Sequence, residues 1–407
     1  MQNITWANRP TLQHAEWEDV QHRISPLVRT VLEKVLTSLD GGVLTHEECL
    51  LLANGTGDDL FGLVVAADEI RRRLVGEVVS YVVTRNINFT NVCFVGCKFC
   101  AFGVGARHQT AYFLSLDEVA QKSREAEEWG ATEVCIQGGL PRDLPPFYYR
   151  DILRAVKSTT PKMHAHAFSP MEMVYGVELT GMPLRDYLFM LKDNGLDTLP
   201  GTAAEILDDS VRHVLSRNKV SAARWREVIE TAHRCGIRST STMMYGHRET
   251  PAHWVDQLFL LREIQSRTGG FTEFVPLGFI HDNTLLFAQG LARAGATLEE
   301  HLKVHALARV MLAGSINHVQ VSWVKLGREV SQLMLLAGAD DYGGTLFEES
   351  ISRLAGATVG QYISTAEFQE RIVELGRIPA QRNTLYTKYL YPMQPDPGEK
   401  FAVGGAA

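Results

Sequence analysis

Three cysteines stand close together in the sequence, at Cys93, Cys97 and Cys100, with Phe99 just before the last. Thiolates grouped in a C-x3-C-x2-C pattern are typical ligands of soft metal ions and of iron–sulfur clusters. A structural zinc site requires a fourth ligand, and the nearest candidate is His108, beyond two glycines. Three cysteines on a four-iron cluster would instead leave one iron open to a small molecule. We favour the cluster, with zinc as the alternative.

Strands and helices alternate along the chain around this cysteine loop. A first strand is expected over residues 81–89, directly before the cysteines, and helices begin at capping boxes such as Ser115–Glu118 and Thr297–Glu300. Further strands are expected at 133–137, 164–168, 197–199, 237–244, 271–275 and 319–323. This alternation predicts an α/β fold, a TIM-like (β/α) barrel that is complete or nearly complete. The loops after the strands of such a barrel gather at one end, which would hold the cysteines.

Three regions follow from this division. Residues 1–78 read as an N-terminal helical extension, 79–315 as the core barrel, and 316–407 as the completion of the barrel and a tail. The tail from residue 383 is rich in proline and glycine and is expected to be a surface extension.

Several predicted strands carry polar residues at the positions that would face the barrel interior. Side chains alternate between the two faces of a strand, and packed barrel interiors favour Val, Ile and Leu. The inward positions predicted here are Asn86, Asn88, Thr90, Glu133, Cys135, Gln137, His164, His166, Gln320 and Ser322. The strand at 237–244 is polar on both faces, so its orientation stays open. These groups could bond to one another and to buried water, but we favour a cavity for a polar ligand, because unpartnered buried groups cost about 1–3 kcal/mol each.

Bulk composition fits a soluble globular protein of 407 residues, with 45% hydrophobic and 21% charged residues. The net charge of −7 gives no general attraction for nucleic acid or anionic membranes. Six cysteines, three of them clustered, argue against a disulfide framework and for a reducing cytoplasm. No signal peptide and no long apolar stretch is expected from the sequence.

The cysteine motif after a first barrel strand resembles the radical S-adenosylmethionine (SAM) superfamily. Gly138-Gly139, after the second large strand, resembles the glycine-rich stretch of that superfamily. The runs at 164–172, 200–207 and 239–247 look like the subgroup that contains FO synthase and the futalosine-pathway enzymes. The runs at 269–281, 320–327 and 343–349 look closest to the CofH family, the second FO synthase subunit. The match covers residues 45–390, with one departure at Gly139-Leu140-Pro141, where a histidine is expected after Gly-Gly-Leu.

The resemblance implies a radical SAM barrel and a defined reaction. SAM would bind the open iron of a 4Fe-4S cluster, and reduction would yield a 5'-deoxyadenosyl radical that abstracts hydrogen from L-tyrosine. Cleavage of the tyrosine Cα–Cβ bond would release 2-iminoacetate and transfer the 4-hydroxybenzyl group to 5-amino-6-(D-ribitylamino)uracil. The other products are methionine and 5'-deoxyadenosine, and the adduct is a precursor of FO and of coenzyme F-420.

The resemblance also assigns candidate residues. Cys93, Cys97 and Cys100 would hold the cluster. The residues expected to bind the cofactor are Phe99, Gln137, Gly138 and Gly139. Those expected to serve in catalysis or substrate binding are His166, Glu205, Tyr245 and His247.

Partners and rivals follow from the same resemblance. The implied partners are the companion subunit CofG and an electron donor such as ferredoxin or flavodoxin. The nearest alternatives are aminofutalosine synthase, the dehypoxanthine futalosine cyclase of menaquinone biosynthesis, and a tyrosine lyase that would release p-cresol. A zinc-stabilised binding module without catalysis is the alternative of a different class.

Overall fold

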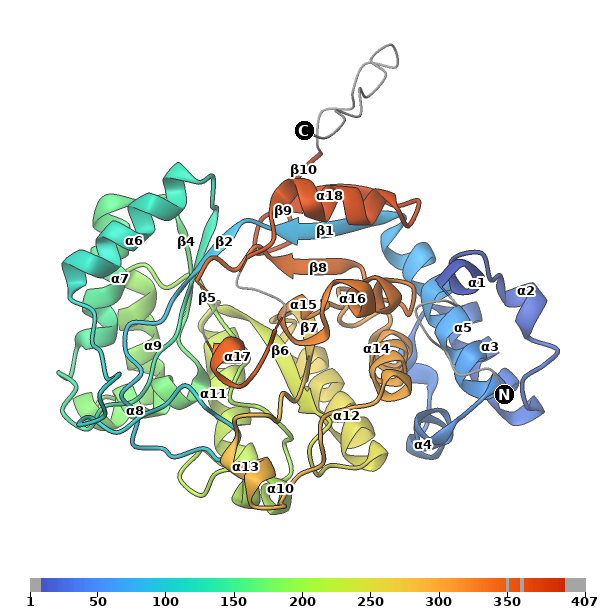
Figure 1. Ribbon diagram of the computed structural model, residues 1–407, viewed down its shortest axis with the longest axis horizontal. Helices are drawn as coiled ribbons and strands as arrows, with labels where there is room; N and C mark the ends of the chain where they lie inside the picture. Colours follow the sequence, from blue (N-terminus) through green and yellow to red (C-terminus); the bar gives the residue numbers. More distant parts are fainter. Residues whose placement is uncertain (1–8, 349–350, 359–361, 392–407) are drawn as a thin grey trace, which may run out of the picture.

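The computed structural model describes residues 9–348, 351–358 and 362–391, and its centre is a six-stranded parallel sheet (Figure 1). In spatial order the strands are β2 (Thr84–Ile87), β3 (Glu133–Ile136), β4 (His164–Ala167), β5 (Thr198–Leu199), β6 (Arg238–Tyr245) and β7 (Phe271–Gly278). Because sequential strands are neighbours and all run parallel, each connection crosses over through a helix. The predicted βαβ organisation is confirmed.

A second sheet lies beside the first and has the order β10-β9-β1-β8. Its members are β1 (Val78–Val82), β8 (Asp341–Gly344), β9 (Ile378–Arg382) and β10 (Tyr389–Leu390). The prediction of one continuous first strand over 81–89 is therefore wrong. The strand divides at Val83, because β1 pairs with β8 and β9 whereas β2 pairs with β3.

Short bridges connect the two sheets into a nearly complete barrel. Phe274 of β7 bridges Val319, Gln320 bridges Asp341 of β8, and Arg85 of β2 bridges Phe347. The predicted strand at 319–323 is thus only a pair of bridge residues, and the chain turns directly into the short helix α15 (Trp323–Leu326). Residues 319–320 therefore join β7 to β8 on one side, and the segment just after β8 joins β2 on the other.

Helices cover the outside of the barrel. They are α6 (Leu116–Glu128), α7 (Tyr148–Thr159), α8 (Pro170–Thr180), α9 (Leu184–Asp193), α10 (Asp209–Leu215), α11 (Ala222–Arg234), α12 (Pro251–Thr268), α13 (Leu285–Ala288), α14 (Leu298–Leu312), α16 (Arg328–Leu335) and α18 (Thr365–Val373). The short helix α17 (Ile351–Leu354) instead borders the cavity inside the barrel. The capping boxes predicted at Ser115–Glu118 and Thr297–Glu300 are both present, with the side-chain and backbone bonds in place. These local signals fixed where the helices begin.

The N-terminal helices pack as a group on one side of the barrel (Figure 1). They are α1 (Arg9–Gln13), α2 (Trp17–Val20), α3 (Pro26–Ser38), η2 (Gly41–Val43), α4 (His46–Asn54) and α5 (Asp58–Val75). The main contact is between α5 and α14. No single helix among the described residues is long and apolar enough to cross a membrane, although α4 and α5, bent by 116°, meet the length and composition test as a pair.

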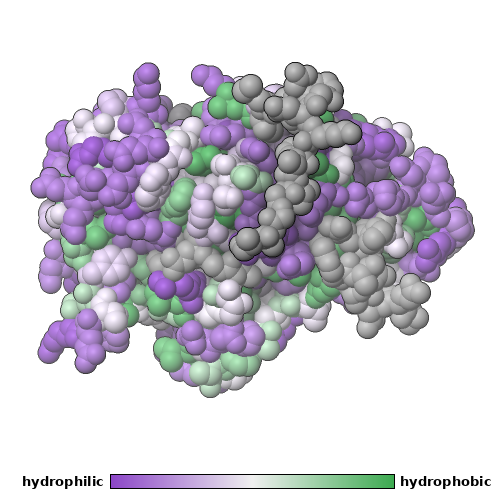
Figure 2. All heavy atoms as spheres, turned by 45° about the horizontal axis from the view of Figure 1, so that its top comes forward, coloured by the Kyte–Doolittle hydropathy of each residue, from purple (hydrophilic) through white to green (hydrophobic). Residues whose placement is uncertain are grey.

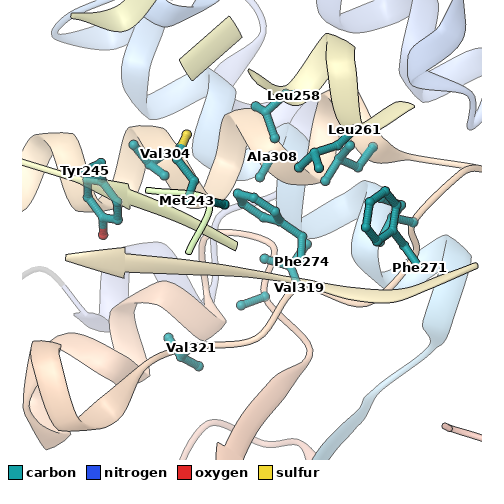
Figure 3. Packing of buried hydrophobic residues seen from close by; sticks show 14 of the residues in the cluster. Met243, Tyr245, Leu258, Leu261, Phe271, Phe274, Val304, Ala308, Val319 and Val321 are labelled. Carbon is teal, nitrogen blue, oxygen red and sulfur yellow. The ribbon is translucent and has the colours of Figure 1, made fainter. Parts of the chain in front are cut away.

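The hydrophobic core between β6, β7 and their covering helices is shown in Figure 3. Met243 and Phe274 leave the two strands toward α12 and α14, where Leu258, Leu261 and Val304 meet them. Their burial fixes which face of β6 and β7 points outward, and so which face points into the barrel.

On the molecular face of Figure 2, hydrophilic residues predominate and apolar ones are scattered. The prediction of a surface extension from residue 383 is wrong for its first residues, because Thr384 is buried and Thr384 and Tyr386 bond to Glu133 and Glu273. The part of this tail beyond residue 391 lies outside the described residues.

Candidate active site

A cavity of about 390 Å³ lies inside the barrel at the carboxyl ends of its strands. Its wall includes Cys93, Cys97, Cys100, Asn86, Cys135, Gln137, Glu172, Thr202, Glu205, Lys219, Thr242, Gln320 and Ser322. The strands, the loops that follow them and helix α17 all contribute to it. Barrels carry their chemistry at this end, so the cavity is the candidate active site.

The cysteine loop is held in place by its own backbone. The amide of Cys93 donates to Val104 O at 2.9 Å, and that of Phe94 donates to Leu140 O at 3.0 Å. A methyl group at Gly103 would lie 3.9 Å from the sulfurs of both Cys93 and Cys100, so these two thiols face the same point. The third thiol, Cys97, lies 3.3 Å from Ser216 Oγ. All three cysteines therefore line one enclosed wall, as a shared inorganic group requires.

Within the described residues, no three His, Cys, Asp or Glu side chains converge closely enough to hold a single metal ion. His108, the fourth ligand that zinc would need, is exposed and its Nδ1 lies 2.9 Å from Thr110 Oγ1. Each cysteine of a four-iron cluster binds a different iron, so the thiols need not converge on one point. The donor set fits the cluster and does not fit a closed zinc site.

Gly138 and Gly139 let the end of β3 approach the cysteine loop. A Cβ on Gly138 would lie 2.6 Å from the ring of Phe89, and one on Gly139 would lie 2.2 Å from the carbonyl oxygen of Val92. The amide of Gly139 donates to Thr90 O at 2.7 Å. Both glycines line the cavity, and their lack of a side chain is required by this contact.

Glu172 connects this glycine pair to helix α8. Its Oε1 accepts from the amide of Gly138 at 3.1 Å, and its Oε2 accepts from the amide and hydroxyl of Ser169 at 2.6 and 2.7 Å. Burial raises the pKa of this carboxyl to about 7. Sequence reasoning did not select Glu172, although Ser169-Pro-Met-Glu172 is a capping box directly after a strand, which was the available signal.

Glu205 enters the cavity as half of an ion pair. Lys219 Nζ lies 2.6 Å from its Oε1, and Arg212 lies 3.6 Å from its Oε2. Lys219 also lies over the ring of Phe99, which places a cation beside the cysteine loop. The pKa of Lys219 is raised despite its burial, because Glu205 stabilises the ammonium. Lys219 too was missed from the sequence, where an isolated lysine in a loop carries no signal.

The upper part of the barrel interior is polar, as predicted. Asn86, Cys135, Gln137, Gln320 and Ser322 all line the cavity. The Oδ1 atom of Asn86 is buried without a hydrogen-bond partner in the described structure. Gln137 is fixed by Thr202, whose hydroxyl donates to its Oε1 at 2.9 Å. These groups are placed to bind a polar ligand.

The lower part of the interior is satisfied by the protein itself. His164 and His166 share the hydroxyl of Thr198, each at 2.8 Å, and burial lowers the pKa of His166 to about 3. Thr384, from the segment after β9, donates to Glu133 at 2.7 Å. For this layer, the alternative that the inward polar groups bond to one another is therefore confirmed.

The same C-terminal segment closes the floor of the barrel. The hydroxyl of Tyr386 donates to Glu273 at 2.5 Å, and its ring stacks on His318 with centroids 3.8 Å apart. Arg382 pairs with Asp341 at 2.5 Å and lies over the Tyr386 ring. The floor is thus a buried, paired polar layer contributed by residues 382–386.

The structure does not bring Tyr245 and His247 to the cavity. Tyr245 lies on the outward face of β6, where its hydroxyl is 2.6 Å from His301 Nδ1 in the helix layer. His247 is fully buried, with Nε2 at 2.9 Å from Met244 O and Nδ1 at 3.2 Å from Glu249. His166 is likewise absent from the cavity wall within the described residues. Thr242 and Met244, on the opposite face of β6, reach the cavity instead.

Sequence comparisons identify the relatives of this chain. The model of the family described as "Radical SAM superfamily" matches residues 87–261, and that described as "CofH/MqnC C-terminal region" matches residues 268–394. The "5-amino-6-(D-ribitylamino)uracil--L-tyrosine 4-hydroxyphenyl transferase" of Methanocaldococcus jannaschii is 50% identical over 330 residues, which are 80% of this chain and 92% of that protein. The "FO synthase" of Mycobacterium leprae is 49% identical over 380 residues, 91% of this chain and 44% of that protein. The chain therefore spans less than half the length of the FO synthases it matches.

Solved structures share the fold. HydG, a maturase of the FeFe-hydrogenase, superposes with a TM-score of 0.69 at 15% identity, covering 92% of this chain and 78% of that one. Methylornithine synthase (PylB) gives 0.66 at 18% identity, covering 86% and 97%. The barrel is that of the radical SAM fold, and the cysteine loop together with the matching family model defines a radical SAM enzyme, whose cofactors are a 4Fe-4S cluster and SAM. Within that superfamily, the chain belongs to the CofH family.

Proposed function

We propose that this enzyme transfers the 4-hydroxybenzyl group of L-tyrosine to 5-amino-6-(D-ribitylamino)uracil, in the biosynthesis of FO. The observation that carries the proposal is the 50% identity to the M. jannaschii transferase over 92% of its length. The products are the benzyl adduct, 2-iminoacetate, methionine and 5'-deoxyadenosine. The second candidate, a futalosine-pathway enzyme, is favoured only by the shared CofH/MqnC C-terminal model.

Cys93, Cys97 and Cys100 would hold the cluster, and Gly138 and Gly139 would border the bound SAM. When bound, these cofactors supply a 5'-deoxyadenosyl radical that removes a hydrogen atom from tyrosine. Phe99 and Lys219 form the wall beside the cysteines, where a ligand carboxylate would meet the ammonium of Lys219. Glu205 keeps that ammonium charged, so we assign Glu205 a positioning role.

The rest of the chain supplies binding and exclusion of water. A ribityl chain and a uracil ring both need many hydrogen-bonding partners, which Asn86, Gln137, Gln320 and Ser322 offer on the cavity wall. The closed floor at Tyr386 keeps solvent from entering the barrel from below. His166 remains neutral at physiological pH because burial lowers its pKa to about 3, so it can serve as a hydrogen-bonding group below the cavity.

Further partners complete the proposal. Reduction of the cluster requires an electron donor such as ferredoxin or flavodoxin. CofG, a companion subunit, would convert the adduct to FO. The reducing cytoplasm is the compartment that keeps the cysteine thiols free to bind iron.

An anaerobic turnover assay with mass analysis of the products tests the reaction. The reconstituted enzyme, incubated with tyrosine, the ribitylaminouracil, SAM and a reductant, should yield the benzyl adduct together with 2-iminoacetate or its hydrolysis product, glyoxylate. Cys97→Ser is the matched negative control. Release of p-cresol without adduct, or turnover only with futalosine-pathway substrates, would refute the proposal.

A further inference from the structure

Four helices in the described part of the chain begin with a capping box that a glutamate closes, yet one of them differs in its surroundings. Glu48, Glu118, Glu172 and Glu300 each occupy the third helical position and bond back to the N-cap. The pKa values of Glu48 and Glu118 are lowered, chiefly by their hydrogen bonds to Lys34 and to Ser115, respectively. Only Glu172 of the four lines the cavity, and it is 1% exposed.

Glu172 has no cationic partner among the described residues. Glu205, the other carboxylate on the cavity wall, is neutralised by Lys219 and Arg212. The groups that act electrostatically on Glu172 or sense its charge are Lys219, at longer range, and the buried hydroxyls of Tyr149 and Tyr187. A buried carboxylate without a countercharge is costly, and helix capping does not require that burial, as Glu118 shows.

The geometry leaves room for one more donor. Oε2 accepts two hydrogen bonds, from the amide and hydroxyl of Ser169, whereas Oε1 accepts one, from Gly138. A carboxylate oxygen can accept two, so Oε1 has an unused position. Glu172 therefore offers a negative charge and an open acceptor beside the glycine pair, on the wall of the cavity.

We propose that Glu172 binds the α-ammonium group of an amino-acid ligand in the cavity. An alkylammonium supplies both the missing charge and the missing donor. The proposed reaction uses two compounds that carry this group, SAM and tyrosine. The inference rests on the proposed function only in naming these two compounds. Glu172 is thereby assigned a role in ligand binding in addition to capping α8.

Equilibrium dialysis on the anaerobically reconstituted enzyme tests the assignment without turnover. Glu172→Gln removes the charge and keeps one carbonyl acceptor, which serves either Gly138 or Ser169. The variant should bind one of the two amino acids about tenfold to a hundredfold more weakly than the wild type, as expected for the loss of one charge-assisted bond. The compound whose affinity falls, SAM or tyrosine, is the one that Glu172 binds.

Two controls make the result specific. Glu118→Gln, the same substitution in an exposed capping box, should bind both ligands as the wild type does. Analogues without the amino group, 5'-methylthioadenosine for SAM and 3-(4-hydroxyphenyl)propionate for tyrosine, should bind equally to the wild type and to Glu172→Gln. Unchanged affinity of Glu172→Gln for both amino acids would overturn the assignment.

A measurement on the wild type covers the case in which Glu172→Gln does not fold. Binding of an ammonium should ionise the partly protonated carboxyl, so calorimetry in two buffers near pH 6.5 should detect proton release that diminishes by pH 8. Equal affinity of the wild type for each amino acid and for its analogue without the amino group would overturn the assignment. If the turnover assay gives no adduct but the dialysis result holds, the proposed reaction fails and the ammonium site stands.

Discussion

Lys219 lies over the ring of Phe99, with its ammonium nitrogen 4.8 Å from the ring centroid and 2.6 Å from Glu205. This contact joins two loops that are far apart in the sequence, the cysteine loop and the loop between α10 and α11. It places a cation directly against the residue before Cys100. The following predictions begin with this pair.

Lys219→Met should destabilise the protein by about 3 kcal/mol, because it leaves Glu205 buried beside Arg212 alone. Urea unfolding of the metal-free protein measures the effect. Lys122→Met, which breaks an exposed pair with Glu348, should cost less than about 1 kcal/mol. The double variant Lys219→Met/Glu205→Gln should recover much of the loss, and no recovery would contradict the pairing.

Serine at Cys93, Cys97 or Cys100 should abolish cluster assembly, because serine lacks the soft thiolate that iron–sulfur clusters prefer. Iron and acid-labile sulfide analysis after anaerobic reconstitution should fall from about four of each per chain to near zero. Cys235→Ala, at a buried cysteine outside the cavity wall, should reconstitute fully. Full iron content in any of the three serine variants would exclude that cysteine as a ligand.

Gly139→Ala should displace the cysteine loop, because the added Cβ would lie 2.2 Å from Val92 O. Backbone must move to relieve this contact, so we expect a loss of about 2–3 kcal/mol in unfolding free energy and impaired cluster incorporation. Gly105→Ala, where a Cβ meets nothing within 4 Å, should change neither quantity appreciably. Equal effects at the two positions would argue against the tight contact.

The stability of the metal-free enzyme should depend on pH through Glu172. Its pKa is raised from 4.5 to about 7, so the folded protein binds more protons than the unfolded chain between these values. The contribution of this carboxyl is therefore most favourable at low pH and is lost as the pH rises toward 7. Glu172→Gln has no such carboxyl, so its unfolding free energy relative to that of the wild type should rise by roughly 2 kcal/mol from pH 5 to pH 8. Denaturant titrations at several pH values measure this difference. A constant difference across that range would contradict the raised pKa.

Tyr386→Phe should weaken the barrel floor, because Glu273 loses a buried hydrogen bond and becomes harder to ionise. We expect a decrease of about 1–3 kcal/mol in unfolding free energy. Faster hydrogen exchange of the lower strand ends should accompany it. Tyr362→Phe, at an exposed tyrosine, is the control and should have little effect on either measurement.

Local and periodic signals predicted much of this structure. The cysteine loop, the capping boxes and the alternation of strands were readable because each depends on neighbouring residues. The break at Val83 was not, since it is imposed by pairing with β8 and β9, far along the chain. The outward direction of Tyr245 was also hidden, because β6 is polar on both faces and only its packing against α12 and α14 decides between them. Glu172 and Lys219 reach the cavity through tertiary contacts that no local pattern records.

The floor of the barrel has a consequence for how the chain folds. Thr384 bonds to Glu133 across 251 positions of sequence, and Tyr386 bonds to Glu273 across 113. Such distant contacts form late and slowly, since the intervening chain must first be ordered. During synthesis on the ribosome the three cysteines therefore emerge long before the chamber around them can close. The cysteine loop lies at the other end of the barrel, so its thiols border the cavity whether or not the floor has closed.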